Sequence, residues 1–198
     1  MNGGAAPAVT PAAVLSFWFG TEDRVDGRWF RRSDAFDREI ATRFGASMAA
    51  ALAGRLDDWA AQPAGTLALI LLLDQFTRNV HRGTPQAFAG DPRALALARQ
   101  LVASGGHRQL PPLQRWFVYM PLEHAEDPAR QQQCVALFEA LAAEAGPHGD
   151  ALAGALDYAR RHRDVIARFG RFPHRNAILG RANTPDEETF LQQPGSAF

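Results

Sequence analysis

Lysine is absent from this chain of 198 residues, and cysteine occurs once, as Cys134. A single cysteine excludes an intramolecular disulfide bond and a zinc site built from several thiolates, and it favours a reducing compartment. We therefore expect a cytoplasmic protein. All 21 basic residues are arginines, and 21 acidic residues balance them to a net charge of zero. This balance argues against a nucleic-acid partner and against a membrane surface held by charge.

Long hydrophobic runs are missing as well. The longest covers residues 67–73, whereas a helix that crosses a bilayer needs about 20 apolar residues. Residues 1–9 have no basic start followed by an apolar run, so we expect no signal peptide. The alternation of β-branched and polar residues that is typical of strands is also absent. These absences favour a helical protein without a membrane segment.

Helical patterns, in contrast, follow one another along the chain. Gly45 is expected to end the helix that begins at residue 33, and Pro121 to end the helix that begins at residue 111. Short connections predict an all-α fold, a single domain of antiparallel helix pairs over residues 10–192, with flexible ends at residues 1–9 and 193–198. The expected helices cover residues 10–20, 33–45, 66–79, 91–106, 111–120, 128–145, 150–169 and 184–191, with shorter ones around residues 52–59 and 174–180.

Helix starts carry suitable capping residues. Thr10 and Asp91 each precede a proline and are expected N-caps. Thr184 is followed three residues later by Glu187, which is the pattern of a capping box.

The central segment, residues 66–79, is apolar on all sides for two turns, which predicts a buried helix. It becomes polar at Asp74, and Arg78 lies one helical turn later. These two side chains are spaced to pair with each other, and Arg78 also suits a helix C-terminus. Such structural roles leave Asn79 and Arg82 unexplained, so all four are also candidates for a binding site.

His162 falls on the apolar stripe of the expected helix 150–169. Such a histidine is either a core residue satisfied by one hydrogen bond, or a side chain that faces a pocket where burial tunes its pKa. Both interpretations stay open.

A further polar group, Glu123, His124 and Glu126, directly follows Pro121. Carboxylates and imidazoles are metal ligands, but the segment has neither an HExxH motif nor a repeated ExxH motif. We therefore predict no metal site and no cofactor, although the sequence leaves metal and haem open.

Residues 168–181, RFGRFPHRNAILGR, are rich in arginine for a neutral protein. A glycine stop and a proline restart place His174, Arg175 and Asn176 in the first turn of a short helix, just after Arg171. A helix N-terminus with arginines suits a phosphate or a carboxylate. The alternative is a structural clamp in which these arginines bind helix C-termini or the acidic residues at 123–127.

Five stretches, in order over nearly the whole chain, match the pattern of a known family: VLSFWFG (14–20), WFRRSDAFDREI (29–40), LLDQFTRNVHRGTPQAFAGDPRA (72–94), MPLEHAED (120–127) and RFGRFPHRNAILGRANTPDEETFL (168–191). In them the chain resembles the bacterial family catalogued as domain of unknown function 924. The resemblance implies a compact all-helical fold related to tetratricopeptide-type α–α superhelices, and it implies that the three polar segments belong together. It brings no established activity. Ala125 stands where the family pattern Glu-His-Ser-Glu has serine.

The first functional hypothesis is a pocket lined by arginine, histidine and glutamate that binds, and in one version transforms, a small phosphate- or carboxylate-bearing molecule. Its acid or base is expected to be His124 or His174. Glu123 or Glu126 would orient that histidine. The candidate ligand-binding residues are Asp74, Arg78, Asn79, Arg82, Glu126, His162, Arg171, Arg175 and Asn176.

The second hypothesis is a tetratricopeptide-like interaction module that binds a peptide or a protein partner. A purely structural role for the polar segments also stays open, because a buried arginine–carboxylate network needs the same residue types. The sequence leaves the oligomeric state undetermined.

Overall fold

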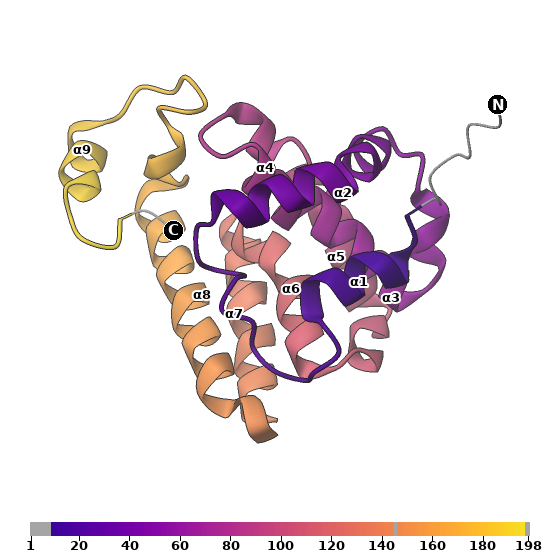
Figure 1. Ribbon diagram of the computed structural model, residues 1–198. Coiled ribbons are helices and arrows are strands. Elements are labelled where there is room, and N and C mark those ends of the chain that lie inside the picture. Colours follow the sequence, from indigo (N-terminus) through magenta and orange to yellow (C-terminus); the bar gives the residue numbers. More distant parts are fainter. Residues whose placement is uncertain (1–8, 145, 197–198) are drawn as a thin grey trace, which may run out of the picture.

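The computed structural model describes residues 9–144 and 146–196, and within these ranges every regular element is a helix (Figure 1). This confirms the all-α fold. The outer parts of the expected flexible ends, residues 1–8 and 197–198, lie outside the described residues. The α-helices are α1 (Pro11–Phe19), α2 (Asp34–Leu52), α3 (Pro63–Ile70), α4 (Phe76–Val80), α5 (Asp91–Ala103), α6 (Pro112–Glu123), α7 (Pro128–Ala143), α8 (Gly149–Phe169) and α9 (Pro185–Leu191).

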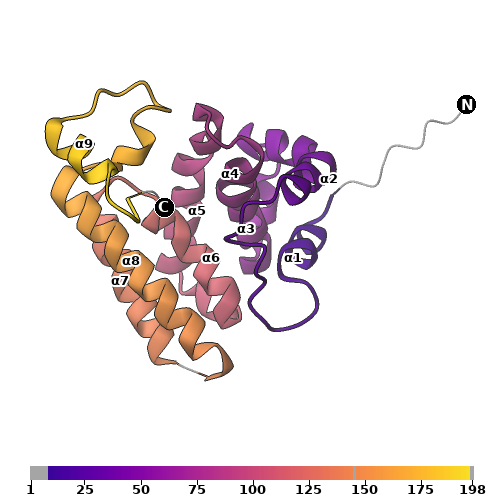
Figure 2. The same cartoon turned by 60° about the vertical axis from the view of Figure 1, so that its left-hand side comes forward.

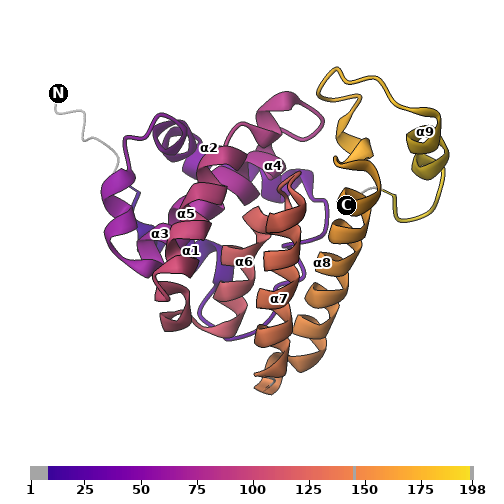
Figure 3. The ribbon, with the colours of Figure 1, turned by 180° about the vertical axis from the view of Figure 1, so that it is seen from behind.

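The apolar segment that contains α3 runs through the middle of the molecule. Residues 67–73 are all fully buried, because no side chain among them needs water. Helices α1, α5 and α6 pack against α3, and α2 packs against α4 (Figure 3). The central segment is therefore the common wall against which the surrounding helices bury their apolar faces.

Helices α7 and α8 form an antiparallel pair along one side of the molecule, and α7 also packs on α6 (Figure 2). Helix α9 lies beyond the C-terminal end of α8 in all three views. A small hydrophobic cluster, separate from the main core, joins the end of α8 to α9. Phe172 is fully buried in it, and Phe190 of α9 packs against it. No helix in the described part of the chain combines the length and the apolar surface needed to cross a membrane.

The helix ends predicted at Gly45 and before Pro121 are wrong, and burial explains both. Helix α2 continues through Gly45 to Leu52, because Met48 and Ala51 bury the same face; this burial outweighs the cost of about 1 kcal/mol for a glycine inside a helix. Helix α6 continues through Pro121 to its end at Glu123, and both residues are buried there. Only one backbone hydrogen bond is lost to the proline, close to the end of the helix.

Three local predictions near other turns also need correction. Trp59 lies in a short 3₁₀ helix, Asp57–Ala61, and not in an α-helix. The expected helix 174–180 is only a 3₁₀ turn over Pro173–Arg175. Asp91 is the first residue of α5 and not its N-cap, which is Gly90, because the Asp91 carboxylate binds Arg78 instead. The predicted caps at Thr10 and Thr184 are confirmed, the latter with a complete capping box.

A π turn over Leu71–Gln75 separates α3 from α4 within the central segment, and the N–H group of Phe76 bonds to the carbonyl of Leu71. Such a turn adds one residue to a helical turn and changes the direction of the side chains that follow; π turns are frequent at functional sites. Asp74 lies inside this turn.

Candidate active site

Asp74 and His124 form a hydrogen-bonded pair at the end of the molecule where α6 ends and α5 begins. Asp74 is fully buried in the π turn, and His124 caps the C-terminus of α6. The distance from Nδ1 of His124 to Oδ1 of Asp74 is 2.7 Å. An ionised carboxylate only accepts, so Nδ1 carries the proton and Nε2 keeps its lone pair. Within residues 9–144 and 146–196, no hydrogen bond engages that Nε2 atom.

The charge of Asp74 is held in place by three donors. Nη1 of Arg78 lies 2.8 Å from Oδ1, and Nε2 of Gln75 donates to Oδ2 at 2.6 Å; His124 is the third. Burial opposes ionisation of Asp74, but the charge of Arg78 and these hydrogen bonds outweigh it and keep the pKa of Asp74 below its ordinary value. Burial and the charge of Arg78 lower the pKa of His124 despite the attraction of Asp74. The pair is therefore a carboxylate and a neutral imidazole near neutral pH.

Arg78 is bound by two carboxylates at once. Besides Asp74, it makes a bidentate pair with Asp91, with distances of 2.7 and 2.9 Å. This pairing leaves Arg78 with little capacity for a ligand. Asp91 is a member of the cluster that the sequence interpretation missed, because a carboxylate at a helix start is usually explained by the helix dipole.

Arg175 is the arginine of the C-terminal segment that reaches the pair. Its Nη1 donates to the carbonyl of His124 at 3.0 Å, and its guanidinium lies between the rings of Phe88 and Phe172, 4.9 and 4.5 Å from their centroids. Nε of Arg175 has no hydrogen-bond partner among the described residues, and Asp91 is 3.7 Å from Nη1. Burial and the charge of Arg78 lower the pKa of Arg175 to about 10, so it stays a cation at neutral pH.

Glu123 and His162 lie beside the pair. Oε1 of Glu123 is 3.3 Å from Nδ1 of His162, and the same Nδ1 donates to the carbonyl of Tyr158 at 2.9 Å. Burial, aided by the charge of Asp74, raises the pKa of Glu123 to about 8. Burial lowers the pKa of His162 to about 3. Both groups are therefore uncharged near neutral pH.

The contacts of His162 are those of a core histidine, and its role in a pocket stays a prediction. It is buried and bonded to the backbone, as a core histidine would be, and its ring centroid lies 6.3 Å from that of His124. His174 lies beside Phe172, with 5.7 Å between the centroids of the two rings. Burial and the charge of Arg175 lower the pKa of His174 to about 4.

The remaining candidates hold the surrounding segments together. Arg171 and Asn176 bind Glu187 of α9. Asn79 and Arg82 both bind Asp37 of α2. Their roles in ligand binding stay predictions, and their visible contacts are structural.

Glu126 fixes the C-terminal segment to the end of α6. It accepts the N–H of Phe172 at 2.8 Å and makes a bidentate pair with Arg181, at 2.6 and 2.8 Å. The carboxylate that contacts His124 is thus Asp74, and not Glu123 or Glu126. The polar segments around Asp74, Glu123 and Arg175 do meet in space. The contacts are also those of the structural clamp, because Arg175 donates to the carbonyl of His124 at the C-terminus of α6 and Arg181 pairs with Glu126.

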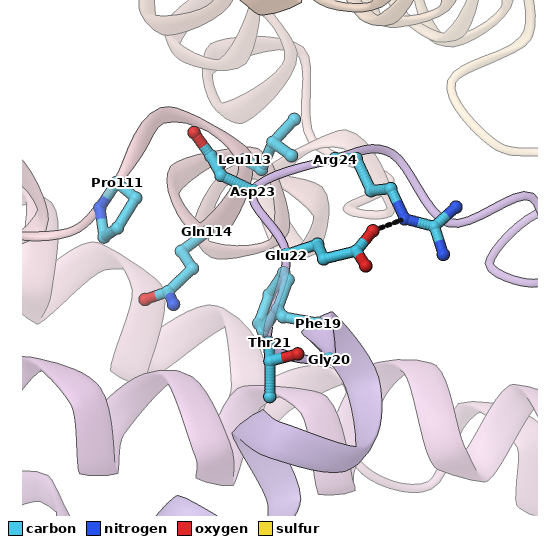
Figure 4. Close-up of a pocket in the computed structure, with 9 residues that line it drawn as sticks. All are labelled: Phe19, Gly20, Thr21, Glu22, Asp23, Arg24, Pro111, Leu113 and Gln114. Atoms are coloured by element: carbon cyan, nitrogen blue, oxygen red, sulfur yellow. Dashed lines mark ion pairs between the residues drawn. The ribbon is translucent and has the colours of Figure 1, made fainter.

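Two surface hollows lie away from this cluster. One, of about 260 Å³, is lined by residues 19–24 and by Pro111, Leu113 and Gln114 (Figure 4). The other lies between the end of α8 and the start of α9, and Arg168, Arg171 and Glu187 contribute to it. Among the described residues, no three histidine, cysteine, aspartate or glutamate side chains are placed to hold a metal ion.

Comparison with known proteins places the chain in a family. The model described as bacterial protein of unknown function (DUF924) matches residues 14–195, so the chain belongs to that family. The solved structure of a protein of unknown function from Agrobacterium tumefaciens is similar, with a TM-score of 0.81 and 38% sequence identity over 92% of this chain and 96% of that one. No protein with a curated description matches the chain.

Proposed function

We propose that the chain binds a small phosphate- or carboxylate-bearing molecule beside the Asp74–His124 pair, and that His124 moves a proton to or from it. The observation that carries this proposal is the 2.7 Å contact to Asp74, which fixes the Nδ1–H tautomer and leaves Nε2 as a base. A buried carboxylate that orients a histidine is a recurrent arrangement in acid–base catalysis.

Arg175 is the proposed anion-binding group. It is cationic, it is held between two aromatic rings, and its Nε atom has no partner among the described residues. A guanidinium that is fixed in this way loses little freedom when it binds a carboxylate or a phosphate. Arg78 contributes positive charge, but its Nη1 and Nη2 atoms already donate to the two carboxylate oxygens of Asp91 and are not available for bidentate binding of a ligand.

A thermal-shift screen with phosphate- and carboxylate-bearing compounds tests binding. A compound present at 100 times its dissociation constant stabilises the folded protein by about 2.7 kcal/mol. We expect Arg175→Lys, which keeps the charge but loses the planar fork, to abolish the shift. Arg160→Lys, at an arginine that pairs with Glu139 on the surface, should preserve it. A screen without hits, or a shift that survives Arg175→Lys, contradicts the proposal.

Proton transfer is tested separately with His124→Asn. The asparagine amide can still donate to Asp74, so the fold is kept, but the Nε2 base is gone. For any compound that wild type turns over and the variant still binds, we expect turnover at saturating concentration to fall by about 10²–10⁴-fold. Unchanged turnover would leave a binding protein without the acid–base role.

A tetratricopeptide-like interaction module is the second proposal, and the successive packing of α6, α7 and α8 favours it. Such a module binds a peptide along its helices, so its affinity would be unaffected by Arg175→Lys and His124→Asn. Crosslinking of a bound peptide to α7 or α8 would support it. For either function we propose the cytoplasm as the location, because Cys134 is buried and unpaired.

A further inference from the structure

Among the described residues, the charges in the candidate active site cancel. Asp74 and Asp91 carry two negative charges, and Arg78 and Arg175 carry two positive ones within the same cluster. At its edge, Glu126 pairs with Arg181. An anionic ligand beside Arg175 would therefore add an unbalanced negative charge to a largely buried place, which is costly unless a positive charge enters with it.

His124 is the group placed to receive that charge. Its Nδ1–H already donates to Asp74, with 2.7 Å between Nδ1 and Oδ1. Arg175, the proposed anion-binding group, donates to the backbone carbonyl of His124 at 3.0 Å. A proton on Nε2 would thus create an imidazolium between a carboxylate and the ligand. His162 is placed less well, because its Nδ1 lies 3.3 Å from the Glu123 carboxyl and already donates to the carbonyl of Tyr158 at 2.9 Å.

We propose, on the basis of the function proposed above, that anion binding takes up one proton from solvent and that this proton resides on Nε2 of His124. The site then selects oxyanions that can accept a hydrogen bond from an imidazolium and from a guanidinium. Its affinity rises as the pH falls, until the imidazole is already protonated in the free protein.

Other groups that face His124 could also make binding depend on pH. Glu123 is the main one, since its pKa of about 8 means that a negative charge appears near the site as the pH rises. His162 and His174, with pKa values of about 3 and 4, stay neutral between pH 6 and pH 8. Within residues 9–144 and 146–196, the titratable and charged groups around His124 are Asp74, Arg78, Asp91, Glu123, Glu126, His162, His174, Arg175 and Arg181.

Calorimetric titration of the full chain with sulfate and with acetate tests the inference, because neither anion changes its charge between pH 6 and pH 8. Titrations at each pH in two buffers with different ionisation enthalpies give the number of protons taken up. We expect uptake approaching one proton per bound anion. The affinity should fall by up to about tenfold for each unit by which the pH is raised. His124→Asn should remove both effects. Glu123→Gln should keep them, as should His81→Asn, at a histidine in the turn after α4.

The outcomes separate the two proposals. Binding of sulfate or acetate to wild type without proton uptake overturns this inference and leaves the proposed function intact. A pH dependence that survives His124→Asn but disappears in Glu123→Gln places the proton on Glu123, which also overturns it. If neither anion binds, the inference falls, and the compound screen decides whether the proposed function falls with it.

Discussion

Oδ1 of Asp74 and Nδ1 of His124 lie 2.7 Å apart although the two residues are 50 positions apart in the chain. The contact joins the π turn of the central segment to the C-terminal end of α6. Asp74 is fully buried, so its charge depends entirely on its protein partners. The pair is therefore both a structural junction and the proposed chemical centre.

Asp74→Asn should strongly destabilise the protein. The amide cannot balance Arg78, and the loss of one partner of a buried ion pair typically costs about 3–5 kcal/mol. Urea denaturation measures the change. Asp164→Asn, in an exposed pair with Arg163, is the matched control and should leave stability almost unchanged. Similar midpoints for Asp74→Asn and wild type would mean that the buried charge is not required.

Glu123→Gln should remove a pH dependence of stability. The pKa of Glu123 is about 8 in the folded protein against an ordinary value of 4.5. Between these values the folded state binds more protons than the unfolded state, so stability falls as the pH rises, by at most about 1.4 kcal/mol per pH unit. Above about pH 8 this contribution is fully lost. We expect denaturation curves at pH 5 to pH 9 to show a flatter profile for the variant; parallel profiles would contradict the raised pKa.

Gly90→Ala should destabilise the start of α5. A Cβ atom at this position would lie 2.1 Å from the carbonyl oxygen of Leu73, so the backbone would have to move. Overpacking of this kind costs about 1–3 kcal/mol, and the shift would separate Asp91 from Arg78. Gly154→Ala, within α8 with nothing within 4 Å of the added Cβ, should instead stabilise by about 0.5–1 kcal/mol. Thermal denaturation should give a lower unfolding midpoint than wild type for Gly90→Ala and a higher one for Gly154→Ala. Changes of the same sign in both variants would contradict this prediction.

Arg171→Ala should release α9 without affecting the active site. Arg171 makes a bidentate pair with Glu187, at 2.6 and 2.8 Å, and also bonds to the carbonyl of Ala182. Hydrogen exchange should become faster over Pro185–Leu191 and stay unchanged around His124. Arg163→Ala, which breaks only an exposed pair, is the control. Faster exchange around His124 as well would show that the last segment and the site unfold together.

The polar segments that the sequence interpretation selected meet in the structure for a physical reason. Asp74, His124 and Arg175 are polar residues at places where an apolar helical pattern stops, and helix ends at the same end of a helical protein tend to meet. His162 stood out because it interrupts an apolar stripe. The interpretation missed Asp91 and Phe88, because a carboxylate at a helix start and an aromatic residue in a turn have ordinary local explanations.

The sequence by itself determined the all-α fold and the buried central helix, because both follow from periodicity and from punctuation by glycine and proline, which act over a few residues. Only the tertiary structure decided which carboxylate holds His124, which arginine is bound by Asp91, and which is held between Phe88 and Phe172. Those choices depend on contacts between distant segments and on the direction that the π turn gives to Asp74. The same distant contacts and burial set the protonation states of Glu123 and His124, which no local pattern encodes.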